Sequence, residues 1–298
     1  MILNLTLNRL SEMLKREEVE LLDTLKKYRI KIDKIMEGLL QGLHRSPFHG
    51  FSVDFKEYRP YEKGDDPRWI DWKLYARSDR FFVKKFEEET NVRIFISQDI
   101  SNSMEFKGKH EIAGKLVALL TYIAYFAGDY VGLFQFNNKE RLYVSPSRKP
   151  AHIKRILDLA LTTKPSGKTD FLRAFDLLSR KISKRSLIII ISDLMDEADK
   201  IINSLKYFKA RHHELIVFHI ISHEEIVLKY QGDIIGVDLE TGRELPLTRE
   251  SLSHLRTIIN SHFMDIYEQF KKLGIRFERF FVEDSFEGQI TRFFIRRR

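Results

Sequence analysis

The sequence predicts an α/β fold in which helices flank a doubly wound, mostly parallel β-sheet, as in Rossmann-like proteins. One sign is the apolar run from Leu187 to Ile191, which is typical of a strand buried on both faces. Another is the alternation of strand-like and helix-like stretches after residue 91. A third is size, because 298 residues with 43% hydrophobic content can bury a full core.

The chain divides into three parts by its texture. Residues 1–45 repeat apolar positions at helical spacing, which predicts an N-terminal amphipathic helical arm. Residues 46–90 alternate aromatic and charged residues, and we expect this small segment to pack on the main domain. Residues 91–298 form the predicted α/β domain, with a hairpin excursion near 226–247.

The elements of the α/β domain follow from hydrophobic periodicity and turn residues. Runs of β-branched and aromatic residues predict strands, and apolar positions at a spacing of three and four predict helices. The strands are expected at 92–96, 131–136, 142–144, 187–191, 215–221 and 276–282. The helices are expected near 109–126, 151–161, 170–182, 197–209 and 249–273, before a terminal helix.

Asp99, Ser101 and Ser103 stand directly behind the first predicted strand of this domain. Mg²⁺ prefers hard oxygen ligands in a near-octahedral arrangement and keeps some of its water, so one carboxylate and two hydroxyls suit it. The same residue types also form turns and helix N-caps. The string by itself therefore leaves a metal site and ordinary loop capping both open.

Two later loops supply further oxygen atoms. Thr169 follows a glycine turn that opens a helical stretch, and Asp193 ends the buried strand at 187–191. A carboxylate is costly to bury unpaired, so we expect Asp193 to face a crevice or a cation. In open α/β sheets ligands bind at this carboxyl edge of the strands.

This order of residues resembles the metal-ion-dependent adhesion site of von Willebrand factor A (vWA) domains. The resemblance implies a vWA-like fold and a bound Mg²⁺ or Mn²⁺. It implies that hydroxyls touch the metal, that two carboxylates hold its waters, and that one position stays open for a partner's carboxylate. The hydroxyls are those of Ser101, Ser103 and Thr169, and the carboxylates are Asp99 and Asp193. Gln98 and Lys168 depart from the usual small or apolar neighbours, and a metal-free A-like domain is the alternative.

Composition excludes several classes of chemistry. The chain has no cysteine, which rules out disulfides and thiolate sites and fits a reducing compartment, so we expect a cytoplasmic protein. No segment is apolar enough to predict a membrane span. The net charge of +8 favours acidic partners, but no nucleic-acid-binding motif accompanies it, so we do not expect nucleic acid as the partner.

The segment at 46–90 carries a dense motif around a turn. Its members are Arg59, Gly64, Asp65, Asp66, Arg68, Asp71 and Trp72. We interpret the charged side chains of this turn, together with Arg77, as a structural ion-pair network in which Arg68 and Asp71 are partners, because partly buried charges need counter-charges. A second acidic metal site or a phosphate clamp is the alternative.

This block, with the Asp99 motif downstream, resembles bacterial proteins of the family known as domain of unknown function 58 (DUF58). The resembling strings are Ser46 to Phe51, Tyr58 to Tyr61, Gly64 to Trp72 and Val83-Lys84. The resemblance implies a vWA-like domain that works with a MoxR-type AAA+ ATPase as a metal-dependent adaptor in the assembly or maturation of client proteins. Many members carry N-terminal membrane helices, which this chain lacks in its sequence.

Two functions remain after these observations. The first is a non-enzymatic protein-binding module that captures a partner's carboxylate through a metal. The second is a metal-dependent hydrolase acting on phosphoesters, which would need further carboxylates such as Asp65 or Asp71 near Asp99 to activate a water.

Overall fold

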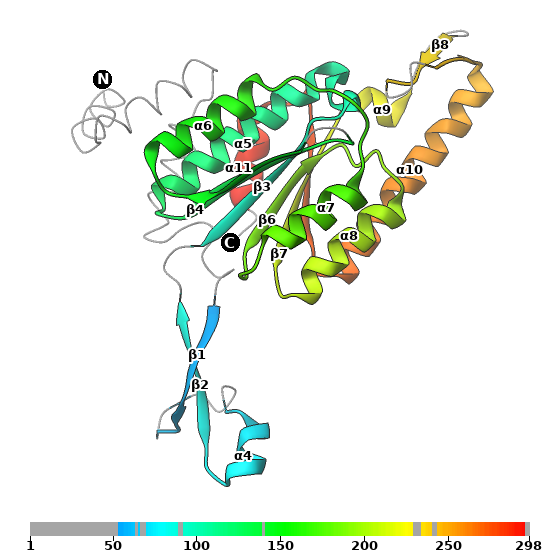
Figure 1. Cartoon of the computed structure of the whole chain (residues 1–298). Helices are drawn as coiled ribbons and strands as arrows, with labels where there is room; N and C mark the ends of the chain where they lie inside the picture. Colours follow the sequence, from blue (N-terminus) through cyan, green and yellow to red (C-terminus); the bar gives the residue numbers. More distant parts are fainter. Residues whose placement is uncertain are drawn as a thin grey trace.

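A computed structural model describes residues 53–62, 65, 70–88, 92–138, 141–228, 234–239 and 243–295 of the chain (Figure 1). The predicted helical arm at 1–45 lies outside the described residues, as do Gly64, Asp66 and Arg68 of the motif at 46–90.

The centre of the molecule is a six-stranded sheet. Its strands are β3 (Arg93–Asp99), β4 (Tyr130–Phe136), β5 (Arg141–Ser147), β6 (Leu187–Ser192), β7 (Glu214–Ile221) and β10 (Arg276–Phe281). They lie in the order β10-β7-β6-β3-β4-β5, and every adjacent pair is parallel except β4 and β5. The predicted doubly wound, mostly parallel α/β sheet is confirmed.

Helices cover both faces of this sheet (Figure 1). One face packs against α5 (Lys109–Phe126), α6 (Pro150–Thr162) and α11 (Phe286–Ile295). The other packs against α7 (Phe171–Lys181), α8 (Ala198–Ala210) and α10 (Arg249–Lys272). Every residue of β6 is buried, with Ile189 facing the first layer and Ile188 the second. This two-sided burial is why the strand is an unbroken apolar run.

Helices α5 and α6 approach each other closely at Gly114. A Cβ atom at this position would lie 2.5 Å from the carbonyl oxygen of Ala160, so only glycine lets the two backbones come this near.

The short elements of the domain follow the strands at the carboxyl edge. The 3-10 segment η2 (Asn102–Gly108) follows β3, and α9 (His223–Val227) follows β7. An antiparallel pair, β8 (Ile234–Val237) and β9 (Glu244–Leu247), lies where the hairpin excursion is predicted.

The N-terminal segment forms its own small unit. It consists of β1 (Val53–Pro60), α4 (Trp72–Ser78) and β2 (Phe82–Glu88), with β1 and β2 antiparallel. Figure 1 shows it projecting beyond the end of the sheet. The packing of this unit on the main domain stays a prediction.

Membrane crossing requires a long helix of continuous apolar character. None of the helices in the described part of the chain meets that requirement.

Candidate functional site

The end of β3 places Asp99 at the carboxyl edge of the sheet, beside the end of β6. The parallel register sets Gln98 opposite Ile191, so the next residues, Asp99 and Ser192, are also neighbours. The hydroxyl of Ser192 donates to Oδ2 of Asp99 at 2.7 Å, and the backbone N–H of Ser101 donates to Oδ1 at 2.9 Å. The Asp99 carboxylate is therefore fixed by hydrogen bonds from two different loops.

The two serines of the motif lie next to each other. The Oγ atoms of Ser101 and Ser103 are 3.0 Å apart, and both side chains are buried. A hydrogen bond from Ser103 also reaches Asp193. Asp99, Ser101, Ser103 and Asp193 thus form one continuous polar cluster, as the sequence order predicts.

The loop that carries Thr169 lies against the Asp99 loop. The N–H of Ser166 donates to the carbonyl of Ile100 at 2.7 Å, and the N–H of Asn102 donates to the carbonyl of Gly167 at 2.8 Å. Gly167 has a φ of +70°, and a Cβ there would lie 2.6 Å from Oδ1 of Asn138. The predicted glycine turn is therefore what brings the Thr169 loop to this edge of the sheet.

Asp193 faces a cation, and that cation belongs to the chain itself. The ammonium of Lys109, at the start of α5, donates to Oδ2 of Asp193 at 2.7 Å. It also donates to Oε1 of Glu225 in α9 at 2.7 Å. The side chains of Lys109 and Asp193 are each 1% exposed, so this is a buried three-residue ion cluster.

Burial and mutual charge shift the ionisation of these groups. Burial, reinforced by the charge of Asp193, raises the pKa of Asp99 to about 7. Burial alone would lower the pKa of Lys109, but the charges of Asp193 and Glu225 outweigh it and raise that pKa. Burial would raise the pKa of Asp193, but the Lys109 ammonium outweighs it and lowers that pKa. Lys109 and Asp193 are therefore both charged at neutral pH.

The donor atoms present here fit a small, hard cation only in part. Carboxylate and hydroxyl oxygens converge as Mg²⁺ requires. The Lys109 ammonium, however, already neutralises one of the two carboxylates. Within the described ranges, no group of three or more His, Cys, Asp or Glu side chains is arranged to hold a metal, so a divalent ion here would depend on the serine hydroxyls.

The two departures from the vWA pattern have hydrogen-bond partners outside the cluster. The amide of Gln98 donates to the carbonyl of Ala160 in α6 at 3.3 Å and accepts from Gln135 at 2.9 Å. Its side chain therefore points toward α6. The backbone N–H of Lys168 donates to Asn138 at 2.9 Å.

Sequence reasoning missed Lys109 and Glu225. Lys109 is the first residue of a helix, a position at which lysine is usually solvated. Glu225 belongs to a capping box with Ser222, and that Ser-x-x-Glu spacing is the signal that could have located it. A lysine or a glutamate at these positions does not by itself indicate burial. The burial results from the packing of α5 and α9 on the strand edge.

The described part of the N-terminal segment contains one ion pair and one helix cap from the predicted motif. Arg59 binds Asp65 through two hydrogen bonds of 2.7 and 2.5 Å. Asp71 is the N-cap of α4, where Oδ1 accepts from the N–H groups of Lys73 and Leu74, each at 3.0 Å. The predicted partner of Asp71, Arg68, lies outside the described residues.

Trp72 of the same motif is 60% exposed. It contacts Tyr75 and Phe81 edge-on, with ring centroids 6.2 and 6.4 Å away.

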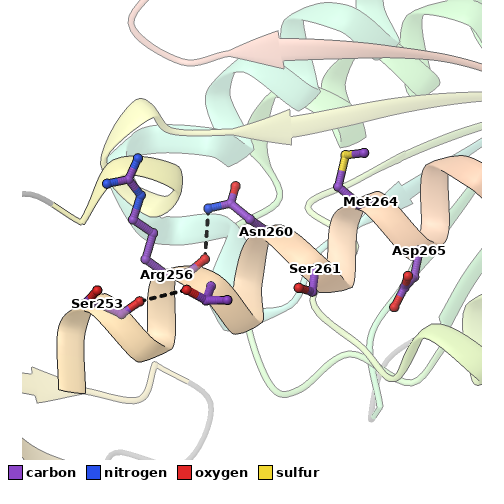
Figure 2. A pocket seen from close by; sticks show the side chains of 7 residues that line it. Ser253, Arg256, Asn260, Ser261, Met264 and Asp265 are labelled. Atoms are coloured by element: carbon purple, nitrogen blue, oxygen red, sulfur yellow. Dashed lines mark hydrogen bonds between the residues drawn. The ribbon is translucent and has the colours of Figure 1, made fainter. Parts of the chain in front are cut away.

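A separate hollow of about 470 Å³ lies on α10 (Figure 2). All the side chains that line it come from this one helix, among them Arg256, Asn260 and Asp265. Asn260 is hydrogen-bonded to the carbonyl of Arg256 at 2.9 Å, one turn back in the same helix. The hollow is a surface depression and does not include the strand-edge cluster.

Several solved structures are similar to the chain at low identity. BatB from Bacteroides thetaiotaomicron is 17% identical, with a TM-score of 0.41, and the match covers 70% of this chain and 98% of BatB. The VWA domain of SpRpn10 is 12% identical, with a TM-score of 0.39, and the match covers 67% of this chain and 94% of that domain.

Sequence comparison gives longer matches. The uncharacterized protein Rv1480 of Mycobacterium tuberculosis (strain ATCC 25618 / H37Rv) is 23% identical over 291 residues, which are 95% of this chain and 91% of that protein. The uncharacterized protein Mb1516 of Mycobacterium bovis matches with the same identity and coverage. A family described as "Protein of unknown function DUF58" matches residues 57–265. Since this match spans well over half of the chain, the protein belongs to the DUF58 family.

Proposed function

We propose that this protein is a non-enzymatic binding module that uses a divalent cation, Mg²⁺ or Mn²⁺, at the strand edge to capture a carboxylate of a partner protein. The observation that carries the proposal is the convergence of Asp99, Ser101, Ser103 and Asp193 in one buried polar cluster at the carboxyl edge of the sheet. The bound ion would supply an electrophilic position for the incoming carboxylate.

The residues of the chain would hold that ion in two ways. Ser101 and Ser103 present adjacent hydroxyls, with Thr169 on the neighbouring loop as the third candidate ligand. Asp99 and Asp193 lie behind them and are suited to accept hydrogen bonds from metal-bound waters. The direct ligands in this arrangement are neutral hydroxyls, and Lys109 already neutralises one of the two carboxylates, which favours capture of a further anionic ligand.

The placement of the other carboxylates also supports binding over hydrolysis. A phosphoesterase would need a general base beside the metal. Asp65 is bound to Arg59, and Asp71 caps α4 and accepts from the hydroxyl of Tyr58 at 2.9 Å. Both are engaged inside the N-terminal segment, so neither is available as the base that the hydrolase hypothesis requires.

As the partner we propose a MoxR-type AAA+ ATPase together with a client protein. Membership of the DUF58 family and the formal charge of +8, which favours an acidic partner surface, support this choice. A cytoplasmic location stays a prediction.

The metal part of the proposal is tested by titrating Mg²⁺ and Mn²⁺ into the purified protein in a calorimeter. The Ser101→Ala/Ser103→Ala variant should lose binding, whereas the matched control Ser97→Ala, a buried serine in the preceding strand β3, should retain it. Equal affinities of the double variant and the wild type would contradict the metal assignment.

The partner part is tested with a purified MoxR-type ATPase from the source organism. Its retention on the immobilised protein should require Mg²⁺, fall on addition of a chelator, and fall in the Ser101→Ala/Ser103→Ala variant. Retention that is the same with and without chelator would mean that the strand edge is not the docking point.

A further inference from the structure

Lys109 occupies an unusual place for a lysine. It is the first residue of α5, directly after Gly108, whose φ of +74° turns the chain from η2 into the helix. Its side chain is 1% exposed, and its ammonium lies 2.7 Å from one oxygen of Asp193 and 2.7 Å from one oxygen of Glu225. A lysine is buried in this way only where its charge is matched, and here two carboxylates match it.

The second of these carboxylates is held firmly in place. Oε2 of Glu225 accepts from the backbone N–H of Ser222 at 2.8 Å, while Oε1 accepts from Lys109. The hydroxyl of Ser222 in turn accepts from the N–H of Glu224 at 3.1 Å, which completes the capping box of α9. Glu225 therefore anchors the Lys109 ammonium beside Asp193.

We propose that Lys109 sets the cation affinity of the strand-edge site, because its ammonium and a divalent ion compete for the negative charge of Asp193. The inference rests on the proposed function, since it concerns the same site. Asp193 receives Lys109 on Oδ2 and a hydrogen bond from Ser103, one of the candidate metal ligands. A divalent ion at the serines and the ammonium thus approach one carboxylate, and two cations repel strongly in a buried, weakly screened setting.

Competition predicts opposite effects for the two neighbours of Asp193. Lys109→Met removes the ammonium and keeps the length and apolar stem of the side chain, so Asp193 becomes available to the metal and the affinity rises. Glu225→Gln removes the anchor's negative charge and leaves Lys109 paired with Asp193 alone, so the affinity falls. A lysine whose charge does not reach the metal would leave the affinity unchanged when it is replaced.

The experiment is calorimetric titration of Mn²⁺ into the full chain at constant pH and ionic strength. We expect Lys109→Met to bind Mn²⁺ about tenfold more tightly than the wild type, a difference of about 1.4 kcal/mol. The matched control is Lys107→Met. Lys107 is an exposed lysine that pairs with Glu224, the neighbour of Glu225 in α9, and its removal should leave the affinity unchanged. Melting curves supply an independent readout, because tighter binding to the folded state raises the Mn²⁺-induced shift in Tm.

Lys109→Met leaves Asp193 and Glu225 buried without a counter-charge and can prevent folding in metal-free buffer. The Lys109→Met/Glu225→Gln variant lessens this, because it removes one charge of each sign and leaves only Asp193 without its counter-charge. Compared with Glu225→Gln, it differs only at residue 109 and should bind Mn²⁺ more tightly.

The outcomes separate this inference from the proposed function. Tighter binding without Lys109 supports it, as does binding that appears only in the variants without Lys109. If the wild type binds Mn²⁺ and the variants without Lys109 bind it equally tightly or more weakly, the competition is overturned and the metal site stands. No binding by the wild type or by any variant overturns the metal site and the competition together.

Discussion

The strand edge of the α/β domain and the N-terminal hairpin unit both contain a basic residue paired with an aspartate, in opposite settings. Lys109 and Asp193 are each 1% exposed and lie between α5, α9 and β6. Arg59 and Asp65 are 36% and 18% exposed on the β1–β2 unit. The chemical partners are alike, but only the first pair is removed from water.

This difference decides what each pair can do. Each charge of an exposed ion pair gives up contacts with water to contact its partner, so the net gain in folding free energy is small. Such a pair orders a surface turn and contributes little else. A buried pair has lost the solvation of both charges, so either partner left alone is strongly unfavourable. The strand-edge cluster can therefore respond to an added cation, whereas the hairpin pair is screened from such effects by water.

The largest expected effect comes from breaking the buried pair. Asp193→Asn should lower the free energy of unfolding by about 3–5 kcal/mol in metal-free buffer, because it leaves the Lys109 ammonium buried without one of its partners. The Lys109→Met/Asp193→Asn double variant should recover part of the loss. Denaturant unfolding measures both, and Asp65→Asn, in the exposed pair, should leave the unfolding midpoint unchanged. A small effect of Asp193→Asn would show that the cluster is solvated.

A smaller effect is expected from the close packing of α5 against α6 in the α/β domain. Gly114→Ala would place a methyl group 2.5 Å from the carbonyl oxygen of Ala160, which forces α5 and α6 apart and should cost about 1–3 kcal/mol. Gly288→Ala, in α11, is the control, because its Cβ would meet only ordinary contacts at 3.5 Å or more. Equal losses in melting temperature for the two glycine variants would contradict the close approach of the two helices.

The pH dependence of stability should also belong to the buried region. Burial lowers the pKa of His219 to about 3, and its Nδ1 is 2.5 Å from the hydroxyl of Tyr267. Below pH 6.5 the unfolded state takes up a proton at His219 that the folded state does not, so stability falls as the pH falls. The loss is about 1.4 kcal/mol per pH unit between pH 6.5 and the folded pKa.

Other groups titrate in the same range, so the test needs a difference between two proteins. The pKa of Asp99, raised to about 7 by burial and by Asp193, acts with the opposite sign, because the folded state then holds the extra proton and stability falls as the pH rises from 4 to 7. His219→Asn keeps a polar atom for Tyr267 and should remove the acid-side loss alone. The free energy of unfolding is measured against pH for both proteins. If the two plots stay parallel from pH 7 to pH 5, His219 is not neutral in the folded state.

The smallest expected effect lies in the hairpin unit. Asp71→Ala removes the N-cap of α4, whose carboxylate accepts from two backbone N–H groups, and should cost about 1 kcal/mol. Asp71→Asn, which retains an N-cap acceptor, is the matched control and should cost less. Because α4 is short, hydrogen exchange of its amides is the suitable measurement, and unchanged exchange in Asp71→Ala would mean that the cap does not stabilise the helix.

The fold could be predicted because its signals are local. The apolar run at 187–191 requires burial on both faces, and this holds for every residue of β6. Helix α5 occupies the predicted range of 109–126, because its apolar positions recur at helical spacing. The placement of Asp99 and Asp193 on adjacent strand ends follows from parallel pairing, which makes strand ends meet at one edge.

The counter-charges of the site could not be predicted in the same way. A sequence shows that a carboxylate at a buried strand end needs a cation, but it does not show which one. Lys109 and Glu225 are separated by 116 positions in the chain and meet only through the packing of α5 and α9. The capping role of Asp71 likewise had no signal in the sequence, because it depends on the first turn of α4, from whose two N–H groups it accepts. Its pairing with Arg68 stays a prediction.

By itself the sequence determined the layers of this protein and the edge at which its polar residues gather, since periodicity and strand polarity depend on neighbours along the chain. Only the tertiary structure decided that the cation facing Asp193 is a lysine ammonium 2.7 Å away. The physical reason is that desolvation and pairing of charges depend on three-dimensional surroundings, and these bring together residues from β6, α5 and α9 that share no local signal.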